Sequence, residues 1–227
     1  MERVLAEWIP VWQANTPSFQ VYIIDDGSTD QTPRDLERLK TRWPFITIHR
    51  QPNRGHGQAC LRGYSLADAS GANWIFQIDS DGQCDPRFFS ALWADRHQSP
   101  VLYGYRHKRE DGITRWWISR ALSLAVWTAT FQWVADPNVP YRLMRKDSLG
   151  PFLNLIPDNA GLVNVCLSVL QHRHFGIAWK NIVFRQRFQG ESKTRFPALA
   201  RQLAALWPDL RRMKASLPRS APFSQSA

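Results

Sequence analysis

Residues 19–30 read Phe-Gln-Val-Tyr-Ile-Ile-Asp-Asp-Gly-Ser-Thr-Asp, and this stretch decides how the rest of the chain is interpreted. Its first six residues are β-branched, aromatic or otherwise strand-compatible, which predicts a buried strand. The strand leads directly into Asp25, Asp26 and Gly27, which favour a turn. In an open α/β sheet, ligands bind beyond the carboxyl ends of the strands, so this turn is a first candidate for a site.

Apolar runs of strand length alternate with longer amphipathic segments on the C-terminal side of this stretch. Further strands are predicted at residues 45–48, 73–78 and 101–103, and helices at about residues 30–41, 57–69 and 86–95. This alternation with short joints predicts an α/β fold with a largely parallel sheet and helices on both of its faces.

The second half of the chain is less regular. Helices are expected at residues 114–133 and 159–173, a chain break at residues 137–140 with a segment at 141–144 after it, and one or two strands within residues 177–188.

The N-terminal side of the stretch departs from the usual order of an α/β fold. Residues 3–12 predict a helix, and Pro10 within it indicates a kink or an early end. Such a sheet normally opens with a strand, and none precedes this helix. We therefore expect a sheet that lacks its first strand.

The length of 227 residues suits one domain with a tail. We expect the domain at residues 1–195, and a basic amphipathic helix with a frayed end at residues 196–227. In this tail, apolar residues at helical spacing include Leu206 and Leu210, while Arg211 and Lys214 supply positive charge. The tail helix either lies on the cytoplasmic surface of a membrane or binds a membrane partner, or else it packs on its own domain.

The composition of the chain indicates which classes of molecule it binds and where in the cell it works. Lys and Arg exceed Asp and Glu by 29 to 19, and the resulting formal charge of +10 favours phosphate-bearing partners. Nucleic acid is not expected, because the sequence has neither zinc-finger spacing nor an RNP-like strand. Three cysteines without metal-ligand spacing indicate a reduced, cytosolic protein. The longest apolar stretch, residues 121–135, is shorter than the ~20 residues that span a bilayer, so no transmembrane helix is predicted.

A second acidic cluster, Asp79-Ser80-Asp81-Gly82-Gln83, follows the third predicted strand. Asp79 and Asp81 can face one hard cation, and Gln83 can add a carbonyl oxygen, a donor set that suits Mg²⁺ or Mn²⁺. Such an ion would neutralise a diphosphate leaving group. Acids and glycines at strand ends also simply build turns, and for either cluster alone that interpretation has about equal weight.

Taken together and in this order, the motifs resemble those of family 2 glycosyltransferases. The turn at residues 25–30 resembles their nucleoside-binding turn, residues 53–59 (Asn-Arg-Gly-His-Gly-Gln-Ala) a loop after the next strand, and Asp79-Ser-Asp81 their metal-binding Asp-x-Asp. Residues 136–145 and 187–193 resemble the polyprenyl-phosphate branch, typified by dolichol-phosphate mannosyltransferase. The resemblance runs from about residue 3 to residue 193 and implies a GT-A (Rossmann-like) glycosyltransferase fold.

The resemblance also implies a role for each matching residue. The residues implied to contact the donor nucleotide are Asp25, Asp26, Gly27, Ser28, Asp79 and Ser80. The residues implied to bind the metal ion are Asp79, Asp81 and Gln83. Phosphate or acceptor binding falls to Arg106, Arg115, Arg120, Arg142 and Ser192. The implied catalytic residues are Asp81, Asp136, Arg187 and Lys193. His56 stands where the family often has Lys, which weakens the expectation of a fixed positive charge there.

The implied activity is transfer of a sugar from a UDP- or GDP-linked donor to a polyprenyl phosphate, assisted by Mg²⁺ or Mn²⁺, at the cytoplasmic face of a membrane. A lipid phosphate is already anionic, so a general base such as Asp136 is less necessary than for a hydroxyl acceptor. Two alternatives stay open: a family 2 enzyme that uses Asp136 as base toward a hydroxyl, and a truncated, inactive scaffold that binds a membrane partner protein. Trp116 and Trp117 either contact lipid or pack in the core.

Overall fold

The computed structural model describes residues 1–110, 113–188, 204–211 and 213, with the side chains of residues 109 and 113–115 outside the description. The described helices are α1 (Glu2–Asn15), α2 (Thr32–Arg42), α3 (His56–Ala69), α4 (Phe89–Ala94), α5 (Ile113–Thr130), α6 (Gly150–Leu153) and α7 (Val163–Phe175), with short 3₁₀ turns at Pro86–Phe88, Asp95–His97 and Lys146–Ser148. The strands are β1 (Val21–Asp26), β2 (Ile46–Gln51), β3 (Trp74–Ile78), β4 (Val101–Arg109), β5 (Tyr141–Arg145) and β6 (Ala178–Phe184). The predicted order of helices and strands is confirmed.

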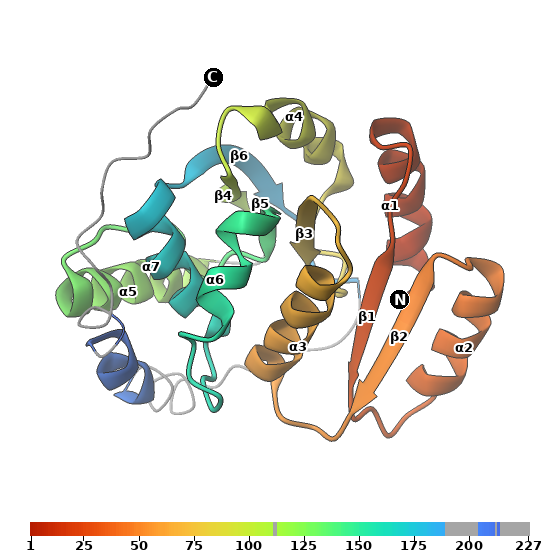
Figure 1. The fold of residues 1–227 in the computed structure, drawn as a ribbon, viewed down its shortest axis with the longest axis horizontal. Coiled ribbons are helices and arrows are strands. Elements are labelled where there is room, and N and C mark those ends of the chain that lie inside the picture. The colour runs from red at the N-terminus through yellow and green to blue at the C-terminus, as the bar shows by residue number, and fades with distance from the viewer. Residues whose placement is uncertain (111–112, 189–203, 212, 214–227) are drawn as a thin grey trace.

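The described strands form two sheets rather than one (Figure 1). Strands β1 and β2 pair in parallel, and the second sheet has the order β3-β5-β4-β6. Along the chain, α1 comes directly before β1. Helices α3, α6 and α7 pack on one another, and α1 packs against α4.

Strand β5 is the exception in the largely parallel arrangement that the sequence predicted, because it runs antiparallel to both of its neighbours, β3 and β4. Its direction follows from the loop that precedes it. This loop contains Asp136, whose contact with Arg106 of β4 keeps the loop at the carboxyl ends of β3 and β4. Tyr141 therefore pairs with Ile78, the last residue of β3, and β5 runs back from there.

Strand β4 is three times as long as its apolar core at residues 101–103 predicted. Its polar second half pairs in parallel with β6, with a register shift between Arg106 and Lys108. The second half of β4 is polar and charged, so it lacks the apolar pattern by which a strand is recognised in a sequence. The predicted strand therefore ended before the observed one.

Helix α1 packs on both sheets. Trp8, 1% exposed, lies with its ring 5.4 Å from that of Phe76 in β3 and 5.8 Å from that of Tyr141 in β5. Leu5 and Ile9 of the same helix belong instead to the apolar cluster of β1, β2 and α2. The helix continues through Pro10 to Asn15, beyond the end predicted from this proline.

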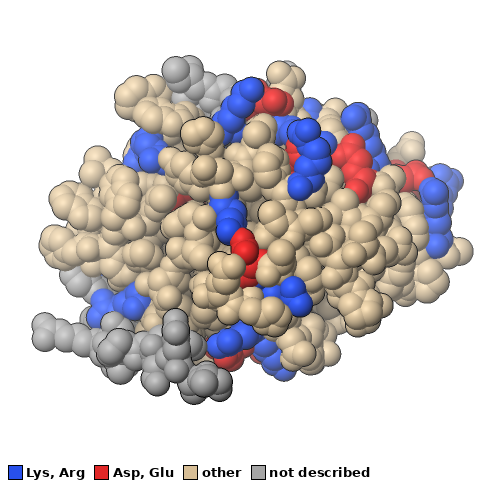
Figure 2. Space-filling view, turned by 90° about the horizontal axis from the view of Figure 1, so that it is seen from above, with Lys and Arg blue, Asp and Glu red and all other residues tan. Residues whose placement is uncertain are grey.

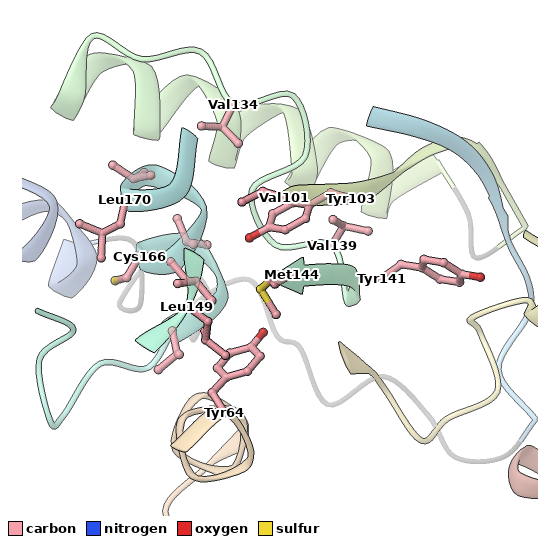
Figure 3. Close-up of a cluster of buried hydrophobic side chains, with 14 of the residues drawn as sticks. Tyr64, Val101, Tyr103, Val134, Val139, Tyr141, Met144, Leu149, Cys166 and Leu170 are labelled. Carbon is pink, nitrogen blue, oxygen red and sulfur yellow. The ribbon is translucent and has the colours of Figure 1, made fainter. Parts of the chain in front are cut away.

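The larger core lies under the second sheet. Side chains of β4, β5 and α7 interdigitate there with Tyr64 of α3, and Figure 3 shows Tyr103, Met144 and Cys166 among them. The described part of the tail is helical at residues 204–211, and its Leu206 and Leu210 are buried in this same cluster. This described part of the tail helix therefore packs on its own domain. The rest of the expected helix lies outside the described residues.

None of the helices in the described ranges combines the length and hydrophobicity that crossing a bilayer requires.

We predict that Trp8→Ala lowers the free energy of unfolding by about 3–5 kcal/mol, because it opens a cavity where α1 meets the second sheet. Urea denaturation followed by circular dichroism measures the change. The control is Trp207→Ala on the tail helix, where the tryptophan is 36% exposed; this variant should shift stability by no more than about 0.5 kcal/mol. Equal stability of the Trp8 variant and the wild type would show that α1 does not hold the sheets together.

Candidate active site

The acidic turns after β1 and β3 lie close enough to interact, although their strands belong to different sheets. His56, at the start of α3, lies between them. Its Nε2 is 3.8 Å from Oδ1 of Asp79, and its charge helps to lower the pKa of Asp26. The carboxyl ends of β1 and β3 therefore form one polar region.

The turn after β1 is held in shape by its own carboxylates. The buried Asp25 accepts a hydrogen bond from the backbone N–H of Ser28 (2.9 Å), and Asp26 accepts from the N–H groups of Arg54 (3.0 Å) and Gly55 (2.8 Å). Burial alone would raise the pKa of Asp26, but these bonds and one from Gln51 lower it. Asp25 thus closes the turn itself, and Asp26 joins the turn to the loop after β2.

Gly27 is required in this turn. It has φ +76°, and a Cβ there would lie 2.7 Å from the backbone nitrogen of Asn53. Gly27 therefore allows the turn after β1 to approach the loop after β2 closely.

The cluster after β3 is joined by Arg187. Its Nη2 lies 3.0 Å from Oδ2 of Asp81 and 3.5 Å from Oε1 of Gln83. Gln83 is buried and donates from its amide to the carbonyl of Arg185 (3.1 Å). The segment after β6 therefore lies along the Asp81–Gln83 turn, and brings together three residues that sequence analysis placed in one site.

A second cation–carboxylate pair lies nearby. Arg106 of β4 donates from Nε and Nη2 to the two oxygens of Asp136, at 2.6 and 2.5 Å, and both side chains are more than nine-tenths buried. Nη2 of Arg106 also lies 3.3 Å from Oγ of Ser119 in α5. Burial and the neighbouring Asp81 raise the pKa of Asp79, while His56, Arg106 and Arg187 act to lower it.

Arg120 lies at the edge of this group. It donates to the carbonyl of Ala135 (2.9 Å), next to Asp136, and its Nε has no partner among the described residues. Of the other residues implied by the resemblance, Ser192 and Lys193 lie outside the described residues, as does the side chain of Arg115.

The expectation that Arg142 binds phosphate does not fit the structure. The side chain is 0% exposed, and it donates to the carbonyls of Val139, Pro137 and Asn164 at 2.7–2.8 Å and to the hydroxyl of Tyr103 at 3.0 Å. All of its nitrogens are used inside the protein. Arg142 therefore fixes the loop that carries Asp136, and its full burial keeps it away from a ligand.

His56 is a positive charge that sequence analysis undervalued. A contact of 3.5 Å with the sulfur of Cys60, together with the carboxylates of Asp79 and Asp81, raises its pKa to about 10. The imidazole is then a cation at neutral pH. The spacing of His56 and Cys60, four residues apart on one helix face, was the signal available in the sequence.

The residues in the turn after β3 carry the types of oxygen donor that a divalent ion prefers. Two carboxylates and an amide oxygen are the hard donors that Mg²⁺ and Mn²⁺ prefer. Within the described ranges no group of three His, Cys, Asp or Glu side chains is arranged around one point, and Arg187 and His56 contact Asp81 and Asp79 instead. An ion at this place would have to replace those contacts.

The face of the molecule in Figure 2 carries basic side chains scattered among acidic and uncharged ones, rather than gathered in one stripe. The excess positive charge therefore does not form a continuous track on this face.

Comparison with known proteins shows what the chain resembles. Residues 2–161 match the model of glycosyl transferase family 2. The undecaprenyl-phosphate 4-deoxy-4-formamido-L-arabinose transferase of Pseudomonas savastanoi pv. phaseolicola is 26% identical over 131 residues, 56% of this chain and 38% of that protein. The dolichol-phosphate mannosyltransferase of Pyrococcus furiosus is 26% identical over 106 residues, 46% of this chain and 29% of that protein. The chain thus spans less than two fifths of the length of these curated relatives.

Among solved structures, a glucosyl-3-phosphoglycerate synthase of Mycobacterium tuberculosis, in complex with Mn²⁺, uridine-diphosphate-glucose and phosphoglyceric acid, superimposes with a TM-score of 0.66. The alignment covers 96% of this chain and 76% of that one at 17% identity. The similarity confirms the expected GT-A (Rossmann-like) fold.

We predict that Arg142→Met destabilises the protein by about 3 kcal/mol or more, because it leaves buried carbonyls without donors. Urea denaturation measures the loss. Arg145→Met, at an exposed ion pair with Asp147, is the matched control and should change stability by no more than about 0.5 kcal/mol. A stable Arg142 variant with weakened phosphate binding would restore the original expectation for this residue.

Proposed function

Because this chain belongs to glycosyl transferase family 2, we propose that it transfers a sugar from a nucleotide-diphosphate sugar to a polyprenyl phosphate at the cytoplasmic face of a membrane. The observation that carries the choice of acceptor is the Arg106–Asp136 pair. Both oxygens of Asp136 accept hydrogen bonds from Arg106, which holds the carboxylate against a buried cation instead of leaving it directed at an acceptor hydroxyl. A phosphate acceptor needs no such base, whereas a hydroxyl acceptor does.

The donor would bind at the carboxyl ends of β1 and β3. In this proposal the turn from Asp25 to Ser28, together with Asp79 and Ser80, receives the nucleoside, as the resemblance implies. The donor diphosphate would meet the positive charges of Arg187 and His56, which already lie beside Asp81 and Asp79 of the turn after β3. Arginine suits this task because its planar guanidinium can hold two phosphate oxygens at once.

Asp79, Asp81 and Gln83 would hold a Mg²⁺ or Mn²⁺ ion. When bound, such an ion neutralises charge on the departing diphosphate. The chain's own cations would share that work, with Lys193 implied as a further one beyond the described residues. Positioning and charge neutralisation, rather than proton transfer, would therefore account for most of the rate.

Arg106, Arg120 and Ser119 would receive the acceptor phosphate, with Arg115 and Ser192 implied by the resemblance alone. Arg106 is oriented by Asp136, and Arg120 lies beside it. The names of the relatives, which include an undecaprenyl-phosphate and a dolichol-phosphate transferase, support a polyprenyl phosphate.

Calorimetric titration of UDP and GDP, with and without Mn²⁺, tests the donor site. We expect one of the two nucleotides to bind in a metal-dependent way, and Asp81→Ala to weaken that binding by at least about tenfold, because it removes a metal ligand. Asp147→Ala, at an exposed acid away from the turn, serves as control. If neither nucleotide binds, the inactive scaffold that binds a partner protein becomes the better interpretation.

The acceptor is tested separately with Asp136→Asn. Transfer to a polyprenyl phosphate should slow but persist, because the acceptor needs no deprotonation. Transfer to a hydroxyl would lose the general-base contribution, roughly 10²–10⁴-fold. Preferred use of a hydroxyl acceptor by the wild type, abolished in this variant, would favour the alternative in which Asp136 is the base.

A further inference from the structure

Helix α5 presents large apolar side chains to solvent. Nine large hydrophobic side chains of the described residues are exposed, and six of them lie on α5 or within three residues of its end: Trp116, Trp117, Leu124, Trp127, Phe131 and Trp133, between 41% and 74% exposed. We call these six residues the α5 apolar face. Scattered exposed apolar residues are ordinary, but a concentration of this kind marks an interaction surface.

The face is one side of a helix whose other side is already buried. Leu122, Val126 and Ala129 pack into the core, at no more than 4% exposed. Trp116, Leu124, Trp127 and Phe131 follow helical spacing on the opposite side, and the rings of Trp116 and Trp117 meet edge to face at 4.8 Å. The helix is thus apolar on both its buried and its exposed side, whereas a helix on a protein surface ordinarily presents polar residues to water.

The backbone conformation of Phe131 is a further indication that the α5 apolar face is an interaction surface. This residue has φ +60°, a left-handed conformation that usually belongs to glycine at the end of a helix. Its side chain is nevertheless large, and with 74% exposure it points to solvent. A strained bulky residue that gains little burial in the isolated protein suits a surface that becomes covered.

The charge around the face determines the kind of surface that would cover it. Residues 112–135 contain two arginines, Arg115 and Arg120, and no acidic residue. The guanidinium of Arg120 lies 5.8 Å from the ring of Trp116. Tryptophan beside arginine is the combination that settles at the boundary between lipid chains and anionic headgroups. A second copy of the chain would instead bring arginine against arginine across a two-fold interface.

We propose that the α5 apolar face docks on the surface of a bilayer that contains anionic lipid, with its tryptophans among the headgroups. The helix would lie along the membrane, since it does not meet the requirements for crossing one. This resolves the two uses left open for Trp116 and Trp117 in favour of lipid contact: both are exposed, at 41% and 63%.

Docking at this face would also present the acceptor to the site. This second step rests on the proposed function. Ser119 of α5 contacts Arg106, and Ser123 and Arg120 both donate to the carbonyl of Ala135, one residue before Asp136. A lipid phosphate at the level of the headgroups would thus meet the arginines proposed to receive it.

Flotation of the full chain with vesicles tests the docking without donor, acceptor or activity. The vesicles are pure phosphatidylcholine, or phosphatidylcholine mixed with phosphatidylglycerol. We expect binding to the mixed vesicles, weakened at high salt, and a loss of at least about tenfold in the double variant Trp117→Ser/Phe131→Ser. Trp207→Ser, an exposed tryptophan on the tail helix, is the control and should bind as the wild type does.

Circular dichroism and urea denaturation check that the double variant is folded, as its exposed positions lead us to expect. Unchanged binding of the folded double variant would overturn the proposal, and so would an equal loss in Trp207→Ser. Self-association of the wild type that disappears in the double variant, without vesicle binding, would assign the face to a second copy. Vesicle binding through α5 by a chain that binds no nucleotide would leave this inference standing while the proposed function fails.

Discussion

The arrangement of the molecule depends on the packing of helix α1 between two sheets that do not pair with each other. Trp8 lies in the core of the second sheet, while Leu5 and Ile9 lie in the cluster of β1, β2 and α2. Helix α1, together with α3, which contacts both β1 and β3, therefore sets how the carboxyl end of β1 stands relative to that of β3. Because His56 touches Asp79 and also influences Asp26, this placement decides whether the two acidic turns act as one site.

Within that site, each acid is already matched by a positive charge or by backbone donors. Asp81 lies against Arg187, Asp136 against Arg106, and Asp79 near His56, while Asp26 accepts backbone N–H groups. Such pairing makes partly buried charges tolerable in the absence of ligand. It also keeps cations and oxygen donors in place for a metal ion and a diphosphate, whose binding would exchange one set of charge pairs for another. Electrostatic preorganisation of this kind suits a reaction that transfers a group between phosphates.

The sequence predicted the order of helices and strands well, because apolar strands and turn residues alternate clearly in the first half of the chain. The resemblance also implied site roles for Asp81, Gln83 and Arg187, and these three side chains lie together in the structure. The sequence did not predict the antiparallel β5, since strand direction depends on where a loop is anchored and not on the strand's own residues. The burial of Arg142 was missed for a related reason: a motif position identifies an arginine, but its partners are carbonyls of the loop at residues 137–139, the carbonyl of Asn164 and the hydroxyl of Tyr103, which only the fold brings together. The charge of His56 likewise depends on neighbours that come from another strand end.

The most direct test of the account is diffraction from crystals grown with the bound nucleotide and Mn²⁺, recorded with anomalous scattering at the manganese edge. We expect one anomalous peak about 2.0–2.3 Å from carboxylate oxygens of Asp79 and Asp81. We also expect the side chain of Arg187 to have moved from Asp81 toward the diphosphate. Nucleotide bound elsewhere, or bound here with no peak and with the Arg187–Asp81 contact unchanged, would contradict the claim that these strand ends form a metal-assisted donor site.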